Sequence, residues 1–346
     1  MKILIVTDAW LPQTNGVVTT LQHVTAGCQA AGHEVQLLEP GAFRTLGLPG
    51  YREVRVAINP FSVGRRIRAI APNAVHVATE GPLGLAARRF LRRHHIPFTT
   101  SLHTKFPEYL HARTRLPLRV GYAFLRWFHR PARSTLVTTR RQRDELEAWG
   151  LDNLRVWGRG VDTALFRPRP RSSTAGLDGP LMLYAGRLAV EKNLEAFLEL
   201  DVPGQKVIVG DGPQRRSLAR RYPDATFVGY SYGDALAEWY ACADVFVFPS
   251  LTDTFGLVML EAMAAGTPVA AFPVTGPVDL VEEGVSGALD ADLAVAIGRA
   301  LGCDREACRR FAETQGWEVV VARFLEDLVV TSWPRRMPSA ARIAVV

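Results

Sequence analysis

The chain has 346 residues, of which 48% are hydrophobic and 22% are charged, a composition typical of a soluble globular protein with room for two domains. Its sequence lacks an apolar run of the roughly 18 residues that a membrane span needs, and Asp8 follows the short apolar run of residues 3–6, which argues against a signal peptide. Residues 1–150 hold 21 Lys and Arg against 9 Asp and Glu, a net charge of +12, whereas residues 151–346 hold 20 against 25, a net charge of −5, so we expect the first half to meet a polyanion such as nucleic acid or an anionic membrane surface.

The first half of the chain alternates short apolar runs with helical patterns. Residues 2–6 are predicted to form a buried parallel strand, followed by a helix from Val17 that stops at Gly32 and by a strand at 35–40. Further strands are predicted at 74–79, 97–103 and 134–139, with a helix at 83–95. Strands that alternate with helices of this length indicate βαβ units and a parallel sheet.

The pattern restarts after residues 167–180, which are rich in Pro, Arg, Ser and Gly and which we interpret as a domain boundary. Predicted strands follow at 181–188, 206–213, 225–230, 243–250 and 268–273. The sequence therefore predicts an α/β fold with two facing, Rossmann-like, doubly wound domains at residues 1–166 and 167–346. Ligands of such sheets bind at the carboxyl ends of the strands, here in the cleft between the domains. The last helix, at 317–330, and the tail at 331–346 could cross back to the first domain.

Two cations follow the first predicted strand of the second half. Arg187 and Lys192 lie in the stretch GRLAVEKN, before a helix expected to begin near Leu194. Two cations near a helix N-terminus suit a diphosphate, although solvated surface charges would explain such a pair equally well. In the first half, Gly16 of the loop TNGV would let the backbone approach a phosphate. No GxGxxG follows the first strand, so the dinucleotide-binding fingerprint is missing.

Two carboxylates flank the start of an apolar helix in the stretch SLTDTFGLVMLEAMAAG. With a helix that begins near Gly256, Glu261 lies inside it and Asp253 just before it. An ionised Glu is costly to bury unless it is paired or solvated, so Glu261 either reaches a wet cleft or has an internal partner. If both carboxylates face the cleft, they offer acceptors for hydroxyl groups on either side of the backbone amides of Thr254, Phe255 and Gly256.

Three other features add candidate site residues. The glycine turns VGDGP and FVGY, which contain Gly212 and Val228, expose amides that suit the edge of a nucleobase but could be ordinary turns. His103 follows a buried strand toward the same cleft, although a lone histidine is more often structural. The four cysteines show no CxxC pair and no His at metal-ligand spacing, so we expect reduced cysteines and no metal site.

Taken in order, these motifs resemble the retaining glycosyltransferases of family 4, which have the two-domain GT-B fold. The similar stretches are TNGV, EGPLG, SLHTKFPEYL, RGVDTALFRP, GRLAVEKN, VGDGP, ADVFVFPS and DTFGLVMLEAMAAGTPVAA, and they run over nearly the whole chain. No single motif decides the matter, but their order and spacing together are highly specific.

The resemblance implies roles for the two acidic residues. Asp253 and Glu261 match the family's pair of acids separated by seven residues. Asp253 would hold hydroxyls of the donor sugar, aided by the amides of Phe255 and Gly256. Glu261 would bind the ribose hydroxyls of the nucleotide.

The resemblance also implies how the diphosphate is held. Arg187 and Lys192 match the pair that neutralises the leaving diphosphate, and Gly16 matches the loop that approaches the phosphates. His103 matches a histidine next to the donor sugar. Because two cations neutralise the leaving group, no divalent metal and no other cofactor is expected.

Two positions depart from the family pattern. Asp253 stands where the family more often has Glu, so its contact with the sugar would be shorter or mediated by water. GRGVD replaces the commoner Asn-Gly version of that loop, which leaves the roles of Arg159 and Asp162 open. Asp162 could equally cap the turn that follows it.

Basic and aromatic residues gather in the stretch RTRLPLRVGYAFLRWFHRPAR of the first half. A basic helix with Trp, Phe and Leu suits shallow insertion at an anionic bilayer, where each cation contributes about 1 kcal/mol. The candidate residues for this contact are Arg115, Arg119, Trp127 and Arg130. The alternative is a core-packing helix with solvated arginines. No nucleic-acid-binding motif is visible. Because the first domain of a GT-B protein receives the acceptor, a basic and aromatic first domain favours a lipid acceptor.

The sequence therefore predicts a cytoplasmic enzyme that is peripheral on the inner face of the cell membrane. It would move a hexose, with retention of configuration, from UDP-glucose, UDP-glucuronate or GDP-mannose to a lipid such as diacylglycerol. One alternative is a GDP-mannose-dependent α-mannosyltransferase that acts on a soluble or polyprenyl-linked saccharide. A nucleotide-sugar epimerase is the other, although it would not need a basic first domain. The expected partners are a nucleotide sugar, a lipid acceptor and an anionic membrane surface, and not nucleic acid.

Overall fold

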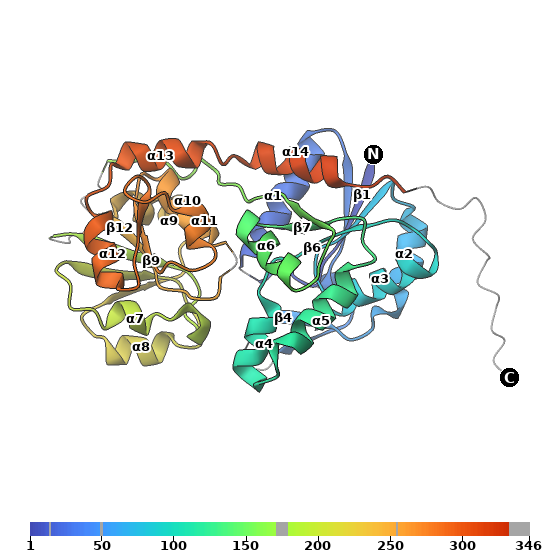
Figure 1. The fold of residues 1–346 in the computed structure, drawn as a ribbon, viewed down its shortest axis with the longest axis horizontal. Helices are drawn as coiled ribbons and strands as arrows, with labels where there is room; N and C mark the ends of the chain where they lie inside the picture. The colour runs from blue at the N-terminus through green and yellow to red at the C-terminus, as the bar shows by residue number, and fades with distance from the viewer. Residues whose placement is uncertain (14, 49–50, 171–178, 254, 332–346) are drawn as a thin grey trace.

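The computed structural model describes residues 1–331 apart from positions 14, 49–50, 171–178 and 254. This part of the chain forms two parallel sheets with their helices, and the two units lie side by side (Figure 1). The predicted pair of doubly wound α/β domains is confirmed. The boundary between 166 and 167 stays a prediction. Residues 171–178 of the expected linker, Thr254 and the tail at 332–346 lie outside the described residues.

The first sheet has six parallel strands in the order β2-β1-β5-β6-β7-β8. They are β1 (Lys2–Val6), β2 (Glu34–Leu38), β5 (Ala74–Val77), β6 (Thr99–Ser101), β7 (Thr135–Val137) and β8 (Leu154–Val156). A separate antiparallel hairpin joins β3 (Thr45–Leu48) and β4 (Tyr51–Ala57). Buried side chains of β1 point alternately into two cores, with Leu4 and Val6 in one and Ile3 and Ile5 in the other. A strand that is buried on both faces is the reason for the continuous apolar run at residues 3–6.

Helices of the first domain connect these strands. They are α1 (Gly16–Ala30), α2 (Val63–Ile70), α3 (Pro82–Arg93), α4 (Phe106–Thr114), α5 (Leu118–His129) and α6 (Arg140–Ala148), with the 3-10 turns η1 (Pro40–Ala42) and η2 (Pro60–Ser62). The side chain of Asn15 caps α1 by accepting from the amides of Val17 (3.0 Å) and Val18 (3.1 Å). This cap fixes where α1 begins, directly after the loop that leaves β1.

The second sheet also has six parallel strands, in the order β11-β10-β9-β12-β13-β14. They are β9 (Leu181–Ala185), β10 (Gln205–Val209), β11 (Thr226–Gly229), β12 (Val245–Phe248), β13 (Val269–Ala271) and β14 (Gly287–Leu289). The helical segments are η4 (Val190–Lys192), α7 (Glu195–Leu198), α8 (Arg215–Arg221), α9 (Gly233–Cys242), α10 (Leu257–Ala264), α11 (Pro277–Leu280), α12 (Leu293–Ala300), α13 (Arg305–Glu313) and α14 (Trp317–Asp327).

In both sheets the strand order reverses beside the first strand, between β1 and β5 and between β9 and β12. A reversal of this kind leaves a crevice at the carboxyl ends of the strands, where ligands of doubly wound folds bind. The loops at 186–194 and 249–256 leave β9 and β12 at this point. They hold most of the residues that the sequence predicts for the donor.

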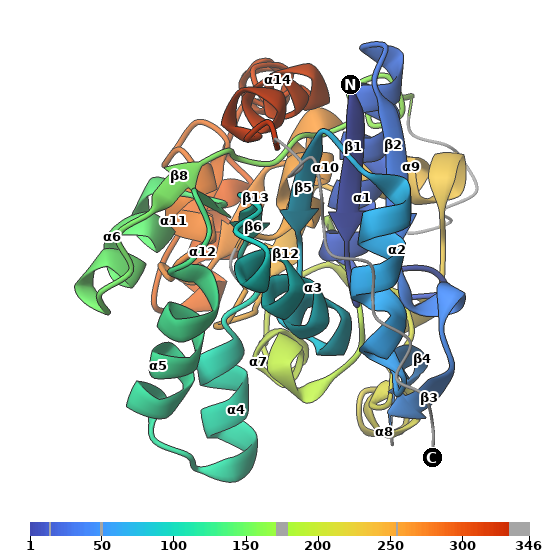
Figure 2. The ribbon, with the colours of Figure 1, turned by 90° about the vertical axis from the view of Figure 1, so that its right-hand side faces the viewer.

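The last helix, α14, crosses back from the second domain to the first. It packs against α1, and a Cβ atom added at Gly27 of α1 would lie only 2.5 Å from Cγ2 of Val321. The two helices therefore approach closely at a glycine. After α14, the Thr331 hydroxyl donates to the carbonyl of Pro72 (2.7 Å). Figure 2 shows α14 at one end of the first domain, with α4 and α5 at the opposite end.

Candidate functional site

Two loops meet at the carboxyl edge of the second sheet and bring together a lysine and an aspartate. The side-chain amide of Asn193, a residue with a left-handed φ of 52°, donates to the carbonyl of Pro249 (3.1 Å) and ties the loop after β9 to the loop after β12. In the same place Nζ of Lys192 lies 2.7 Å from Oδ1 and 2.8 Å from Oδ2 of Asp253. Both side chains remain partly exposed, at 22% and 18%. One predicted cation and one predicted acid thus form a single ion pair.

Arg187 lies on the same edge, just after β9. It is half-buried, and its backbone carbonyl accepts a hydrogen bond from the hydroxyl of Tyr184 (2.9 Å). The helix that was expected to begin near Leu194 is α7, which spans only four residues. A helix of one turn has a weak dipole, so its N-terminus adds little to the charge of the two cations. The cationic side chains themselves carry the positive charge here.

Gly212 and Val228 lie beside these loops, at the ends of β10 and β11. A Cβ atom at Gly212 would lie 2.4 Å from the carbonyl oxygen of Leu188, so only glycine lets the two loops pack at this distance. Gly210 donates its amide to the carbonyl of Gly229 (2.7 Å), the residue after Val228. A hollow of about 560 Å³ opens at this edge, lined by Asp211, Gly212, Pro213, Arg215, Arg216 and Ala219.

The start of α10 lies against the start of α1 from the other domain. Gly256 caps α10 with a φ of 83°, and the preceding Phe255 is buried in the core of the second domain. A Cβ atom at Gly16, the first residue of α1, would lie 3.5 Å from Cδ1 of Leu257. The structure therefore brings the predicted phosphate loop of the first domain to the loop that holds Asp253.

Glu261 lies inside α10, and its partner is a tyrosine rather than a cation. The hydroxyl of Tyr240 on α9 donates to Oε2 of Glu261 (2.9 Å). Burial raises the pKa of Glu261 to about 7, although the hydrogen bond from Tyr240 acts in the opposite direction. Glu261 thus has an internal hydrogen-bond donor, which is one of the two arrangements that its sequence position left open.

His103 is held at both ring nitrogens. It follows β6, is 8% exposed, and its Nε2 lies 2.8 Å from Oγ of Ser101. Its Nδ1 lies 2.8 Å from Nη2 of Arg159. Burial, and after it the charge of Arg159, lowers the pKa of His103 well below its usual range. His103 is therefore a neutral imidazole at physiological pH.

The basic helix predicted at the first domain is α5, and the structure decides between the two interpretations of its apolar side chains. Tyr122, Leu125 and Phe128 are buried in the cores of the domain. The expectation that the Phe and Leu side chains of this helix insert into a bilayer is therefore wrong for these residues, because the domain itself covers them. Trp127 is half exposed, and it stacks on the guanidinium of Arg88 at 3.8 Å.

The solvent face of α5 and the turn before it remain basic. The exposed side chains on this surface include three of the predicted arginines and Trp127, namely Arg115, Arg119, Trp127 and Arg130. We call these four residues the basic face. It lies at the α4–α5 end of the first domain, away from α14 (Figure 2).

One polar contact joins the two domains beside the site. Oγ1 of Thr275, in the loop after β13, donates to Oε1 of Glu145 on α6 (2.5 Å), and Lys105 lies 3.0 Å from the other carboxylate oxygen. A Cβ atom at Gly276 would lie 3.1 Å from the carbonyl oxygen of Asp253, so this loop also covers the backbone of the acid loop. Thr275 therefore connects α6 of the first domain to the loop of the second domain that lies against Asp253.

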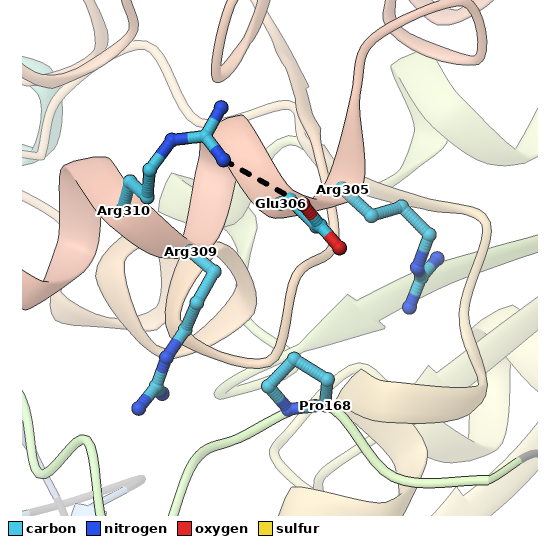
Figure 3. Close-up of a pocket in the computed structure, with 5 residues that line it drawn as sticks. All are labelled: Pro168, Arg305, Glu306, Arg309 and Arg310. Atoms are coloured by element: carbon cyan, nitrogen blue, oxygen red, sulfur yellow. Dashed lines mark ion pairs between the residues drawn. The ribbon is translucent and has the colours of Figure 1, made fainter.

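A second hollow, of about 260 Å³, lies away from these loops, under α13. Figure 3 shows its lining residues, which are Pro168, Arg305, Glu306, Arg309 and Arg310. Arg305 donates to the carbonyl of Ala243 (2.6 Å), and Arg309 donates to the carbonyl of Phe166 (2.7 Å). These guanidinium groups hold α13 and the chain before β9 to the second domain, which is a structural role.

Metal-ligating side chains do not gather in the part of the chain that the structure describes: it has no group of three or more His, Cys, Asp or Glu placed to hold an ion. Cys28, Cys242 and Cys308 are buried on helices. Within the same residues, none of the helices is both long and apolar enough to span a bilayer.

Sequence reasoning missed three contributors to this site. Tyr240 pairs with Glu261 from 21 residues away, and no local pattern signals that contact. The link between Thr275 and Glu145 is equally invisible before folding. Ser101 could have been found, because a short buried strand of three hydroxyl residues before a histidine needs hydrogen-bond partners.

Both halves of the chain are similar to known proteins. Residues 14–165 match the family model described as "Glycosyltransferase Family 4", and residues 179–302 match "Glycosyl transferases group 1". The chain is 33% identical over 316 residues to a GDP-mannose-dependent alpha-mannosyltransferase of Mycobacterium tuberculosis, covering 84% of this chain and 83% of that protein. It is 28% identical over 347 residues to the alpha-monoglucosyldiacylglycerol synthase of Streptococcus pneumoniae, covering 87% of this chain and 78% of that protein.

A search of solved structures gives the same fold. The chain superposes on a sucrose-phosphate synthase of Thermosynechococcus elongatus with a TM-score of 0.77 and 22% identity, over 94% of this chain and 97% of that one.

Proposed function

This chain belongs to glycosyltransferase family 4, and from that premise we propose that it transfers a hexose from a nucleoside-diphosphate sugar to a lipid acceptor at a membrane surface. Its two facing parallel-sheet domains are the GT-B fold. The single observation behind the donor half of the proposal is the edge of the second sheet, where Lys192 and Asp253 pair on adjoining loops beside Arg187.

On this proposal the donor binds along that edge. Arg187 and Lys192 neutralise the diphosphate, and Asp253 receives hydroxyls of the sugar together with the amides of Phe255 and Gly256. Glu261 receives the ribose hydroxyls. Gly16 brings the start of α1 to the phosphates, and its contact with α10 supports that placement. Gly212 and Val228 border the nucleobase.

The proposed reaction retains the configuration of the sugar. The bond from the anomeric carbon to the diphosphate oxygen breaks while the acceptor oxygen bonds to the same face of that carbon. The acceptor proton passes to the leaving phosphate oxygen. Arg187 and Lys192 stabilise the negative charge that develops on the leaving group, and this electrostatic effect is the main catalytic contribution assigned to the protein. No metal or other cofactor is assigned a step.

The acceptor half of the proposal depends on the basic face. Arg115, Arg119 and Arg130 would lie against anionic headgroups, with Trp127 at the headgroup level, and the enzyme would be peripheral on the cytoplasmic face of the cell membrane. The resemblance to a synthase of a glucosyl diacylglycerol supports a lipid acceptor. Diacylglycerol is the acceptor we propose to test first.

A second candidate is a GDP-mannose-dependent α-mannosyltransferase whose acceptor is a soluble or polyprenyl-linked saccharide. The 33% identity to a mannosyltransferase of that donor supports it. The two candidates share the same donor edge and differ in the base, the sugar and the acceptor.

A transfer assay separates these functions. Anionic vesicles that contain diacylglycerol are incubated with the protein and with labelled UDP-glucose, UDP-glucuronate, UDP-galactose or GDP-mannose in parallel. A labelled lipid from one donor supports the proposal and identifies the donor. Slow donor hydrolysis without a labelled lipid would favour the second candidate, whose acceptor is a saccharide. Conversion of the donor sugar to its epimer without any acceptor would show that the protein is an epimerase and not the proposed transferase.

A further inference from the structure

Strand β6 is buried and yet entirely polar. Its side chains alternate, so Thr99 and Ser101 point to one face of the sheet and Thr100 to the other. Each face supplies a buried histidine as a partner. Thr100 meets His129 of α5, whose other ring nitrogen lies 3.1 Å from Glu80. On the opposite face, Ser101 contacts His103.

On that face the polar groups form one continuous chain. Nε2 of His103 lies 2.8 Å from Oγ of Ser101, which lies 3.0 Å from Nε2 of His76. Nδ1 of His76 lies 2.9 Å from Oγ1 of Thr99. His76 and Ser101 are both fully buried. Each contact in such a chain needs one donor and one acceptor, so a fixed donor at one end sets the direction of the contact beside it.

Arg159 sets that direction. Its guanidinium is 4% exposed, donates from Nη1 to the carbonyl of Gly158 (2.8 Å), and stacks on the ring of Trp157 at 4.7 Å. Nη2 lies 2.8 Å from Nδ1 of His103. A guanidinium can only donate, so Nδ1 of His103 must carry the lone pair and its proton must be on Nε2. Nε2 therefore donates to Ser101, whose own hydrogen is left for His76 or for the carbonyl of Ala78 at 3.3 Å.

We propose that Arg159 is a positioning residue for the transfer reaction, which holds His103 as a neutral imidazole with its proton on Nε2. Arg159 acts through His103, and the proposal rests on the proposed function together with the family resemblance, which implies that His103 lies next to the donor sugar. Anchored at both nitrogens, the ring keeps one orientation just after β6, at the carboxyl end of that strand. Because both nitrogens of the neutral ring are engaged, the ring does not take a proton from the acceptor hydroxyl, which leaves that proton for the diphosphate oxygen.

The charged groups around His103 favour the same state. Besides burial, the groups that lower its pKa are Arg159 on the loop after β8, His76 on β5 and His129 on α5. All three disfavour an imidazolium, because each adds positive charge when protonated. Burial lowers the pKa of Arg159 to about 9, so the guanidinium stays charged at neutral pH.

The test is nitrogen NMR of the histidine side chains in the whole protein, with ¹⁵N-labelled histidine. We expect His103 of the wild type to show a protonated Nε2, a bare Nδ1 and no titration between pH 5 and 8. In Arg159→Met, Nδ1 loses its donor, so the His103 signals should show a mixture of tautomers, and the pKa of His103 should rise although burial, the larger cause of its low value, remains. The proposal is overturned if His103 of the wild type carries its proton on Nδ1, or if its signals are the same in Arg159→Met.

Kinetics then test whether this positioning matters for transfer. With the donor identified above, Arg159→Met should lower kcat roughly tenfold and leave the KM for the donor within about twofold, because the donor is bound by the second domain. It should also add an acidic limb to the pH profile, at the pH where its His103 titrates. Unchanged kcat and pH profile, in a variant whose NMR signals do change, would restrict Arg159 to a structural role.

Two further variants serve as controls. Arg88→Met removes another guanidinium that is 4% exposed, stacks on a tryptophan and donates to a backbone carbonyl, but contacts no histidine. It should leave the His103 signals unchanged. Arg159→Lys keeps a cationic donor and should restore the wild-type tautomer. If Arg159→Met does not fold, the wild-type signals still test the proposal, because a proton on Nδ1 of His103 overturns it. The NMR readout does not need turnover, so absence of transfer by the wild type would count against the proposed function and not against the tautomer.

Discussion

Lys192 and Asp253 form an ion pair in which one ammonium group lies within 2.8 Å of both carboxylate oxygens. The pair joins the loop after β9 to the loop after β12, so it links a residue assigned to the diphosphate with one assigned to the sugar. A donor that binds there must share this ammonium group with Asp253. The position of the lysine is thus set before any phosphate arrives, which is the kind of preorganisation that electrostatic catalysis needs.

The pair can be measured by a double-mutant cycle with Lys192→Ala, Asp253→Ala and the double variant. We expect a coupling of about 1 kcal/mol in chemical denaturation, since both side chains are only partly exposed. We expect Lys192→Ala to lower transfer by roughly tenfold or more without unfolding the protein, because the developing charge on the diphosphate loses a partner. Wild-type turnover in Lys192→Ala would show that Lys192 does not contribute to transfer.

Glu261→Gln tests the carboxyl group beside Tyr240. Because the pKa of Glu261 rises from 4.5 in the unfolded chain to about 7 in the folded protein, the folded state holds its proton more tightly. The stability contribution of this carboxyl is therefore fully present below about pH 4.5, is lost as the pH rises to about 7, and stays lost above that. Gln cannot ionise, so the free energy of unfolding of Glu261→Gln relative to wild type should increase over this window by about 1 to 3 kcal/mol.

Urea denaturation at several pH values measures this difference. Tyr240→Phe is the matched control, because it removes the hydrogen bond that stabilises the carboxylate and should move the window to higher pH. A difference between Glu261→Gln and wild type that does not change with pH would contradict the raised pKa. In transfer assays, Glu261→Ala should lower activity by roughly tenfold or more, since the ribose loses its acceptor.

Gly16→Ala separates a role in phosphate binding from a role in folding. The added methyl group would lie in ordinary contact with Leu257, at 3.5 Å, and Gly16 has no left-handed φ, so the free energy of unfolding should change by less than about 0.5 kcal/mol. Transfer should nevertheless fall severalfold, because the methyl group prevents the close approach of the backbone to a phosphate. Transfer at the wild-type rate would show that this approach is not needed.

Gly210→Ala is the contrasting variant. Gly210 has a φ of 137°, and a Cβ atom there would lie 1.9 Å from the carbonyl oxygen of Gly186. It should therefore lower the free energy of unfolding by more than about 2 kcal/mol. Thermal unfolding of the two variants side by side gives this comparison directly.

The basic face predicts a salt-dependent attachment to membranes. Replacing Arg119 and Arg130 by Gln should weaken binding to anionic vesicles by about 1 kcal/mol for each residue, roughly fivefold each. Arg220→Gln with Arg310→Gln makes the same change in net charge on exposed helices of the second domain and should leave binding unaltered. Sedimentation with vesicles at low and high salt measures both, and binding of wild type that does not weaken with salt would exclude the basic face as the contact.

The fold could be predicted because its signals are local. Apolar strands such as β1 and β12 alternate with helices along the chain. Parallel sheets place the carboxyl ends of their strands at one edge, so the edge that holds Lys192 and Asp253 follows from that pattern. Contacts that join distant segments gave no such signal. Nothing in the sequence near His103 indicates that Arg159, 56 residues away, contacts its ring. The burial of one face of α5 was undecided for the same reason, since a helix with apolar and basic faces fits either a core or a bilayer.

The return of α14 to the first domain affects how the chain folds during its synthesis on the ribosome. Phe324 of α14 packs at 5.7 Å from Trp157 and at 5.0 Å from His76, and Val321 fills the space at Gly27. The face of the first domain that α14 covers, which includes α1 and His76, is therefore exposed until the whole second domain has been synthesised. The nascent first domain exposes an apolar surface during that interval. This surface is covered only when α14 packs against α1.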